Sequence, residues 1–250
     1  MVWWEMVVIM LAGIAAGWTN VMAGGGSLLT VPIMLFMGVP GPVANGTNRV
    51  AIIAQNITAA VTFFKKGFSD FKLSISLSLA ALPGAIVGAL VGTELDGIWF
   101  NRIVAVVMVV VMFLMATEQK PAANAEAKPL TKGRLITAHI CMVGAGFWGG
   151  FIQLGVGFLL MPILHRILGL DLVRVNMHKV FVVMVFSVAA LAIFASRVEI
   201  FWLMGLCLAV GNSIGGWLGA RSAIQGGEKL IKRVFNAVMV VFIIKLLFFP

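Results

Sequence analysis

Charged side chains are scarce in this sequence of 250 residues: only 11% are Asp, Glu, Lys or Arg, whereas an ordinary soluble domain carries about 25%. Apolar residues make up 61% of the chain and the mean hydropathy is +1.08. This composition excludes a soluble globular domain, because so much apolar surface requires the lipid bilayer as its solvent. Long apolar tracts occupy almost the whole chain and leave no room for a soluble catalytic domain.

Acidic residues are especially few, and all nine Asp and Glu residues fall in loops or at the ends of apolar tracts. A proton relay of the pump type needs carboxylates within the membrane, so this distribution argues against such a relay. The eighteen Lys and Arg residues give a net charge of +9. They are spread over several short loops instead of one face or arm, which argues against nucleic acid as a partner.

Cysteine and histidine are also rare. Cys141 and Cys207 lie inside apolar tracts, which is typical of small packed thiols and not of disulfides or metal ligands. The three histidines are scattered, and the sequence contains no His-Glu-x-x-His motif. No nucleophile has a readable base beside it, as an intramembrane enzyme would require. We therefore expect neither an enzyme nor a bound metal or cofactor.

The apolar tracts predict an all-α integral membrane protein. They lie near residues 6–38, 45–64, 73–92, 98–116, 135–168, 177–195, 200–219 and 231–249. The first and fifth exceed the roughly 20 residues of a spanning helix, and glycines, which disfavour helix, interrupt both near the middle. These interruptions are Gly24, Gly25, Gly26 and Ser27 in the first tract, and Gly149, Gly150, Gly155 and Gly157 in the fifth.

The distribution of basic residues distinguishes two topologies. If every tract crosses once, Lys and Arg divide nearly equally between the two sides of the membrane. If the first and fifth tracts turn back at their glycines, one side holds only Arg49, Arg102, Arg197 and Lys245, and the other holds the remaining fourteen. Because cytoplasmic loops are rich in Lys and Arg, the second arrangement is favoured. It predicts ten segments with both termini in the periplasm.

The two halves of the chain resemble each other at an offset of about 130 residues. Matching positions are Trp18 and Trp148, Gly25 and Gly155, Pro32 and Pro162, Arg49 and Lys179, and the glycine series 84, 88, 92 and 211, 215, 219. The polar segment 117–134 separates them as a cytoplasmic linker between repeats 1–116 and 135–250. Since each repeat would have about five segments, an odd number, the second enters the membrane from the opposite side. Such inverted repeats are typical of secondary transporters.

The glycine motifs carry a family resemblance. The run from Ala23 to Pro32, followed by Ala44-Asn45-Gly46-Thr47-Asn48, resembles the first-half signature of the sulfite exporter TauE/SafE family. The run from Gly149 to Phe158, followed by Pro162, resembles the family's second motif, although Gln153-Leu154 interrupts its glycines. The resemblance implies a carrier of small anions, such as sulfite, sulfonates or related organic acids, in the bacterial inner membrane.

An anion carrier needs hydrogen-bond donors and positive potential within the membrane, and the N-termini of broken helices supply both. We expect the two breaks to face each other, with polar side chains from both halves beside them. The predicted substrate-binding residues are Gly24, Gly25, Gly26, Ser27, Asn45, Thr47, Asn48 and Arg49 in the first half, and Gln153, Gly155, Gly157, Asn176, His178 and Lys179 in the second. Arginine suits bidentate capture of a sulfonate or carboxylate.

Simpler interpretations remain open at this point. The glycines of the first motif would also serve a tight turn or close helix packing, and Arg49 and Lys179 would also extend to the membrane surface from helix starts. His178 would also pair locally, and the glycine series 84, 88, 92 and 211, 215, 219 favour packing. The whole protein would also fit a passive anion channel or a structural membrane subunit. The sequence is compatible with a homo-oligomer.

Overall fold

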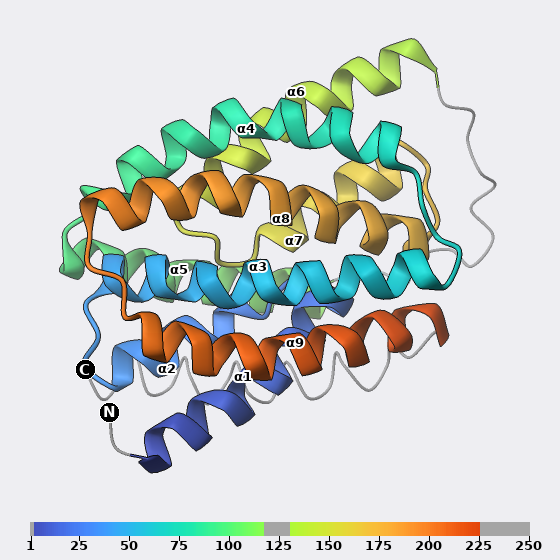
Figure 1. Ribbon diagram of the computed structural model, residues 1–250. Coiled ribbons are helices and arrows are strands. Elements are labelled where there is room, and N and C mark those ends of the chain that lie inside the picture. Colours follow the sequence, from blue (N-terminus) through green and yellow to red (C-terminus); the bar gives the residue numbers. More distant parts are fainter. Residues whose placement is uncertain (1–2, 118–130, 226–250) are drawn as a thin grey trace.

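The computed structural model describes residues 3–117 and 131–225, and all regular structure in these two ranges is helical (Figure 1). The helices are α1 (Trp3–Ala23), α2 (Ser27–Phe36), α3 (Gly41–Lys65), α4 (Phe71–Thr93), α5 (Gly97–Thr117), α6 (Lys132–Phe151), α7 (Val156–Pro162) with the π-helical turn η1 (Ile163–Ile167), α8 (Leu172–Arg197) and α9 (Trp202–Gln225). The predicted tract 231–249 and most of the predicted linker lie outside the described residues.

Four of the described helices, α1, α4, α8 and α9, are long and apolar enough to cross a membrane. Shorter apolar helices are α2, the first part of α5, and α7 with η1. Helix α3 has 25 residues and spans about 37 Å at the usual rise of 1.5 Å per residue, but many of its positions are polar. The protein is therefore a multi-pass membrane protein, and its described ranges are all-helical.

Helices from the two halves of the chain alternate within one bundle. The most extensive contacts join α1 to α9, α4 to α6, α3 to α9, and α8 to both α4 and α3. The two glycine series make two of these contacts possible: Gly84, Gly88 and Gly92 of α4 lie against α6 backbone, and Gly211, Gly215 and Gly219 of α9 lie against α1 backbone. A Cβ atom at any of these positions would meet main-chain atoms, so the packing interpretation of both series is confirmed.

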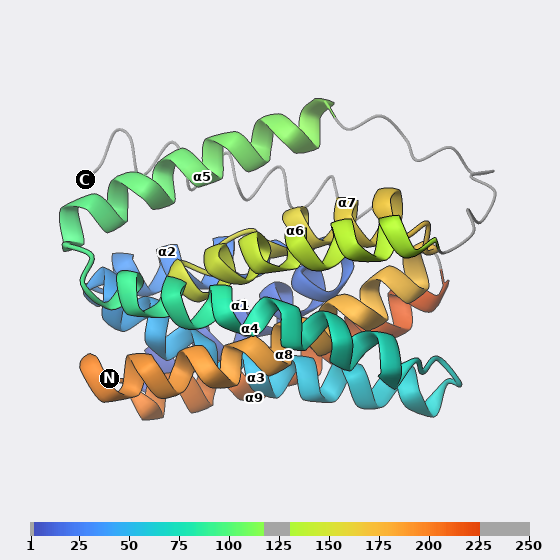
Figure 2. The same ribbon diagram turned by 90° about the horizontal axis from the view of Figure 1, so that it is seen from above.

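The bundle has two ends that are distinguished by which helices begin there. Helices α1, α3, α5 and α9 begin at one end, whereas α4, α6 and α8 begin at the other (Figures 1 and 2). Helices α3 and α8 start earlier than the predicted tracts 45–64 and 177–195, at Gly41 and Leu172. Pro42 lies in the first turn of α3, where its missing N–H costs nothing, and α8 begins after Asp171.

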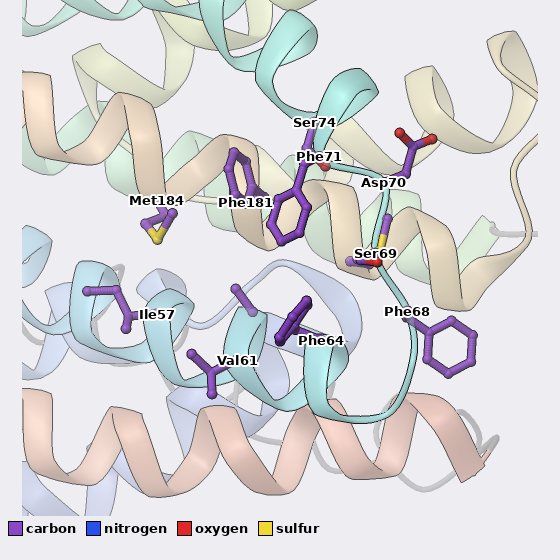
Figure 3. Close-up of a pocket in the computed structure, with 12 residues that line it drawn as sticks. Ile57, Val61, Phe64, Phe68, Ser69, Asp70, Phe71, Ser74, Phe181 and Met184 are labelled. Carbon is purple, nitrogen blue, oxygen red and sulfur yellow. The ribbon is translucent and has the colours of Figure 1, made fainter.

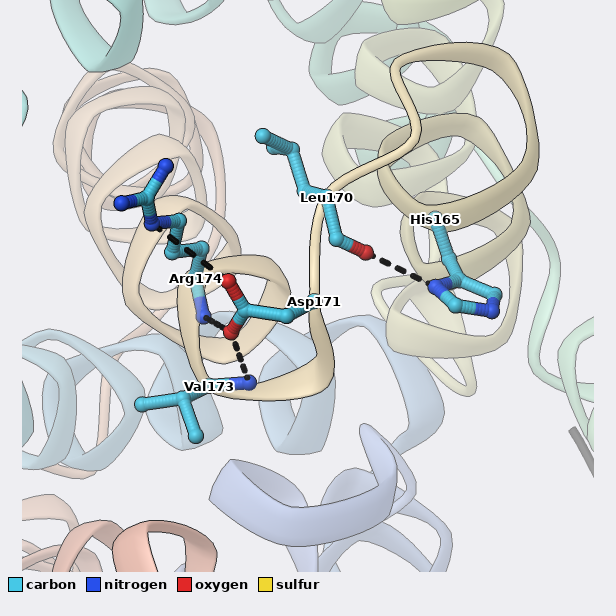
Figure 4. A network of polar contacts seen from close by, with 5 residues as sticks. All are labelled: His165, Leu170, Asp171, Val173 and Arg174. Atoms are coloured by element: carbon cyan, nitrogen blue, oxygen red, sulfur yellow. Dashed lines mark hydrogen bonds and ion pairs between the residues drawn. The ribbon is translucent and has the colours of Figure 1, made fainter. Parts of the chain in front are cut away.

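Asp171 fixes the start of α8. Its carboxylate accepts hydrogen bonds from the backbone N–H groups of Val173 and Arg174 and forms an ion pair with the Arg174 side chain (Figure 4). His165 Nδ1 lies 2.8 Å from the carbonyl oxygen of Leu170 in the same connection. His165 therefore has a local structural partner. The start of α8 positions two of the predicted site residues, His178 and Lys179, in the interior of the helix.

Candidate functional site

The two long tracts are each broken at their glycine motif. Helix α1 ends at Ala23 and α2 begins at Ser27, with Gly24 in the left-handed region at φ +82°. Helix α6 ends at Phe151 and α7 begins at Val156, with Gln153 at φ 62° and Gly155 at φ 66°. Glycine adopts this conformation at little cost, whereas a non-glycine residue such as Gln153 is strained in it.

The backbones of the two broken tracts touch each other. A Cβ atom built on Gly24 would overlap the Cα atom of Gly157, and a Cβ built on Gly157 would overlap Gly24. Gly26 lies equally close to the backbone of α1 at Ala16. The first motif therefore combines a turn at Gly24 with close packing at Gly24 and Gly26, and the two motifs meet at the junction of the halves.

Arg49 lies beside the second break and is fully buried, at 0% exposure. Its guanidinium group donates to the carbonyl oxygens of Gly149, at 3.0 Å, and Gly150, and to Gln153 Oε1 at 2.6 Å. It also lies 4.6 Å from the ring centre of Phe194, a cation–π distance. Its Nε has no hydrogen-bond partner in the described part of the chain. Arg49 is thus an interior residue of α3, and its placement at the membrane surface is wrong.

Lys179 occupies the corresponding place beside the first break. Its side chain is 2% exposed, and its Nζ donates to the carbonyl oxygen of Val21 and to Asn176 Oδ1, both at 2.7 Å. Val21 lies in the last turn of α1. Helix α8 begins seven residues earlier, so the surface interpretation is wrong for Lys179 as well.

Each of these cations therefore binds the C-terminal end of the broken helix from the other half. A helix C-terminus carries roughly half a negative elementary charge, so the carbonyl oxygens compensate only part of each positive charge. Two ion pairs among the described residues, Arg174 with Asp171 and Arg197 with Glu94, lie at helix ends and involve neither cation. Arg49 and Lys179 consequently leave the centre of the bundle electropositive.

Asparagines complete the links between α3 and the breaks. Asn45 donates to the carbonyl oxygen of Phe151 at 2.8 Å, and its own oxygen lies 3.5 Å from Arg49 Nη2. Asn48 donates to Ser27 Oγ at 3.1 Å and accepts from Thr30 Oγ1 at 2.7 Å. One turn of α3 thus binds the end of α6 on one side and the first turn of α2 on the other.

Two predicted site residues lie apart from this arrangement. The hydroxyl oxygen of Thr47 accepts a hydrogen bond from the backbone N–H of Phe201, in the connection before α9. His178 faces α4, where its Nδ1 lies 2.8 Å from Ser74 Oγ, and its Nε2 is buried without a partner among the described residues. The remaining members of the prediction, Gly25 of the first break included, lie at the breaks or bind Ser27, Arg49 or Lys179.

Three residues at the breaks were absent from the sequence prediction. Asn20 accepts from the N–H of Gly26 through its side chain at 3.3 Å. Ser187 lies 3.0 Å from Gln153 Nε2, and Phe194 faces Arg49. Ser187 follows Lys179 by eight residues, which places both on one face of α8. That spacing was the signal by which the sequence could have indicated Ser187, and it is weak in a helix rich in apolar residues.

Comparison with known proteins identifies the family. The profile of the family described as sulfite exporter TauE/SafE matches residues 9–246. Among relatives, a "Probable membrane transporter protein ORF9" of Sinorhizobium sp is 24% identical over 97% of this chain and 92% of its own length. The "Probable membrane transporter protein YfcA" of Escherichia coli strain K12 is 25% identical over 96% of this chain and 89% of its own.

A "Probable membrane transporter protein" of Haemophilus influenzae is 23% identical over 91% of this chain and 88% of its own length. No solved structure matches the chain significantly. The names of the family and of these relatives indicate a membrane transporter. Since the family profile covers nearly the whole sequence, the chain belongs to the sulfite exporter TauE/SafE family.

Proposed function

We propose that this protein is a secondary transporter that moves a small anion, such as sulfite, a sulfonate or a related organic acid, across the bacterial inner membrane. The substrate would bind at the junction of the two breaks, between Arg49 and Lys179. The family name and the names of the relatives support transport. The anionic charge of the substrate is inferred from the side chains at the junction.

The observation that carries this proposal is the pair of buried cations. Arg49 and Lys179 are almost completely removed from solvent, and their partners are helix C-termini and neutral amides. Burying a charge costs several kcal/mol unless a partner compensates it. A bound anion would supply the missing compensation, and the unpartnered Nε of Arg49 offers it a further donor.

We further propose that the halves are inverted repeats of about five segments each. The exchange of partners supports this: α3 of the first half binds the end of α6, and α8 of the second half binds the end of α1. In the proposed topology the end where α4, α6 and α8 begin faces the cytoplasm. The described basic residues of that end outnumber those of the other; they are Lys65, Lys66, Lys72, Lys132, Arg134, Arg166, Arg174 and Arg221, against Arg102 and Arg197.

The contact between Gly24 and Gly157 favours a carrier over a passive channel. It closes the junction with main-chain atoms, so an anion would pass only after the two breaks separate. Alternating movement of one repeat against the other would provide this separation. A channel that conducts continuously would need an open path at the same place.

Reconstitution into proteoliposomes tests the proposal. Uptake of labelled sulfite should saturate and should be faster into vesicles preloaded with unlabelled sulfite, because exchange is a property of carriers. Arg49→Gln should abolish uptake, Arg49→Lys should retain part of it, and Arg197→Gln, which changes an exposed arginine paired with Glu94, should leave it unchanged. Uptake that is unaffected by preloading would contradict the carrier mechanism, and unaltered uptake by Arg49→Gln would contradict the site.

A further inference from the structure

An open groove with a volume of about 260 Å³ lies between α3, α4 and α8, at the end where α4 begins. Its walls are largely apolar and include Ile57, Val61, Phe64, Phe71, Phe181 and Met184 (Figure 3). The groove is separate from the junction of the breaks. Ser74, which lines it, is the residue that pairs with His178.

Aromatic rings bridge the three helices along this groove. The ring centres of Phe64 and Phe71 are 5.8 Å apart, and those of Phe71 and Phe181 are 6.1 Å apart. Nevertheless Phe64 is 57% exposed and Phe71 is 50% exposed. Three rings in contact, two of which leave half their surface uncovered, form a wall for an apolar ligand.

Three lysines adjoin the residues of the apolar wall in the chain, at the same end of the bundle. Lys65 follows Val61 by one helical turn on the same face of α3, Lys66 is the next residue, and Lys72 stands one turn before Ile75 on the exposed face of α4. All three lysines are exposed. Asp70 contributes one opposite charge, but its carboxylate is already bound to the N–H of Leu73 as the cap of α4. The rim therefore has an excess of two positive charges.

We infer that this groove binds an anionic phospholipid, with an acyl chain against Phe64, Phe71 and Phe181 and the phosphate group at Lys65, Lys66 and Lys72. An apolar groove that opens beside a basic rim at the end of a membrane helix bundle matches both parts of such a lipid. Basic residues near a membrane surface attract anionic headgroups, and lysine extends its ammonium to the headgroup region while its stem stays apolar. The inference depends on the membrane location and not on the transported substrate.

Native mass spectrometry of the detergent-purified protein tests this inference, with phosphatidylglycerol and phosphatidylcholine as probes. The wild-type protein should bind phosphatidylglycerol more tightly. The triple variant Lys65→Gln, Lys66→Gln, Lys72→Gln should weaken that binding by about a hundredfold, since each of the three basic residues contributes about a factor of five. A control triple variant, Lys132→Gln, Arg166→Gln, Arg221→Gln, removes three exposed charges from the same end and should change it less than threefold.

A second variant tests the apolar part. Val61→Trp places a larger side chain in the groove and should weaken the binding of both lipids without changing their order. Equal losses in the two triple variants would overturn the inference, because only total charge would matter. The inference would also be wrong if Val61→Trp left lipid binding intact but converted a dimer to a monomer, since a second copy of the chain would then occupy the groove.

Discussion

Substitution of Gly24 by alanine tests the contact between the two breaks. Gly24 has φ +82°, and its Cβ would overlap the Cα atom of Gly157 and lie 2.8 Å from the Gly157 carbonyl carbon, whereas ordinary contacts begin at 3.4 Å. The carbonyl carbon alone would require the two breaks to separate by 0.6 Å, and the overlap with the Cα atom requires more. Gly38 has nearly the same backbone conformation, φ +81°, but no atom lies within 4 Å of its would-be Cβ. It is therefore a matched control for the cost of the left-handed conformation.

The two variants should differ by the cost of the contact alone. The left-handed conformation costs alanine about 1–2 kcal/mol at either position, and overpacking adds about 1–3 kcal/mol. Gly24→Ala should therefore lower the unfolding free energy by about 2–5 kcal/mol, and Gly38→Ala by about 1–2 kcal/mol.

Thermal unfolding in detergent should show Gly24→Ala about 2–12 °C below Gly38→Ala, since 1 kcal/mol corresponds to about 2–4 °C in a chain of this size. Gly24→Ala should also transport more slowly. Equal unfolding temperatures for the two variants would refute the contact.

Two further predictions concern packing and orientation. The Cβ atom of Gly88→Ala would meet the Phe147 carbonyl, so this variant should destabilise the protein by about 1–3 kcal/mol. The control Gly144→Ala, on the open face of α6, should not lower the unfolding temperature. An unchanged stability of Gly88→Ala would contradict the α4–α6 packing. In a background lacking Cys141 and Cys207, a cysteine at Ser69 should react in intact cells only with membrane-permeant thiol reagents. A cysteine at Asp96, at the opposite end of the bundle, should react with impermeant reagents as well, and the reverse pattern would overturn the proposed orientation.

The helical membrane character and the break positions could be predicted because both have strong local causes. Apolar tracts of spanning length indicate the lipid environment, and clustered glycines in a tract too long for one span disfavour an unbroken helix there. The two glycine series at spacing four also indicate close helix contacts without any knowledge of the partner. The structure adds the partners: the series of α4 packs on α6 and that of α9 packs on α1.

The placement of the polar residues was harder to predict, because it depends on helix starts and tertiary contacts. Hydropathy alone placed Arg49 and Lys179 near the beginnings of their helices, but a proline turn and an aspartate cap start α3 and α8 earlier. Arg49 and Lys179 therefore lie in the interior of their helices and are buried in the bundle. Thr47 belongs to the predicted cluster by position in the chain, yet α3 rotates it about 200° from Asn45, toward the connection before α9.

Binding of anions to the purified protein tests the central claim most directly. We would measure unfolding temperature against sulfite, sulfate, thiosulfate, short sulfonates and matching carboxylates, since a ligand at one hundred times its Kd stabilises the folded state by about 2.7 kcal/mol. The account predicts stabilisation of the wild type by one class of these anions. It also predicts loss of that effect in Arg49→Gln and in Lys179→Gln, and its retention in Arg197→Gln. Absence of stabilisation by every anion, or an undiminished effect in both Arg49→Gln and Lys179→Gln, would contradict the proposed anion site.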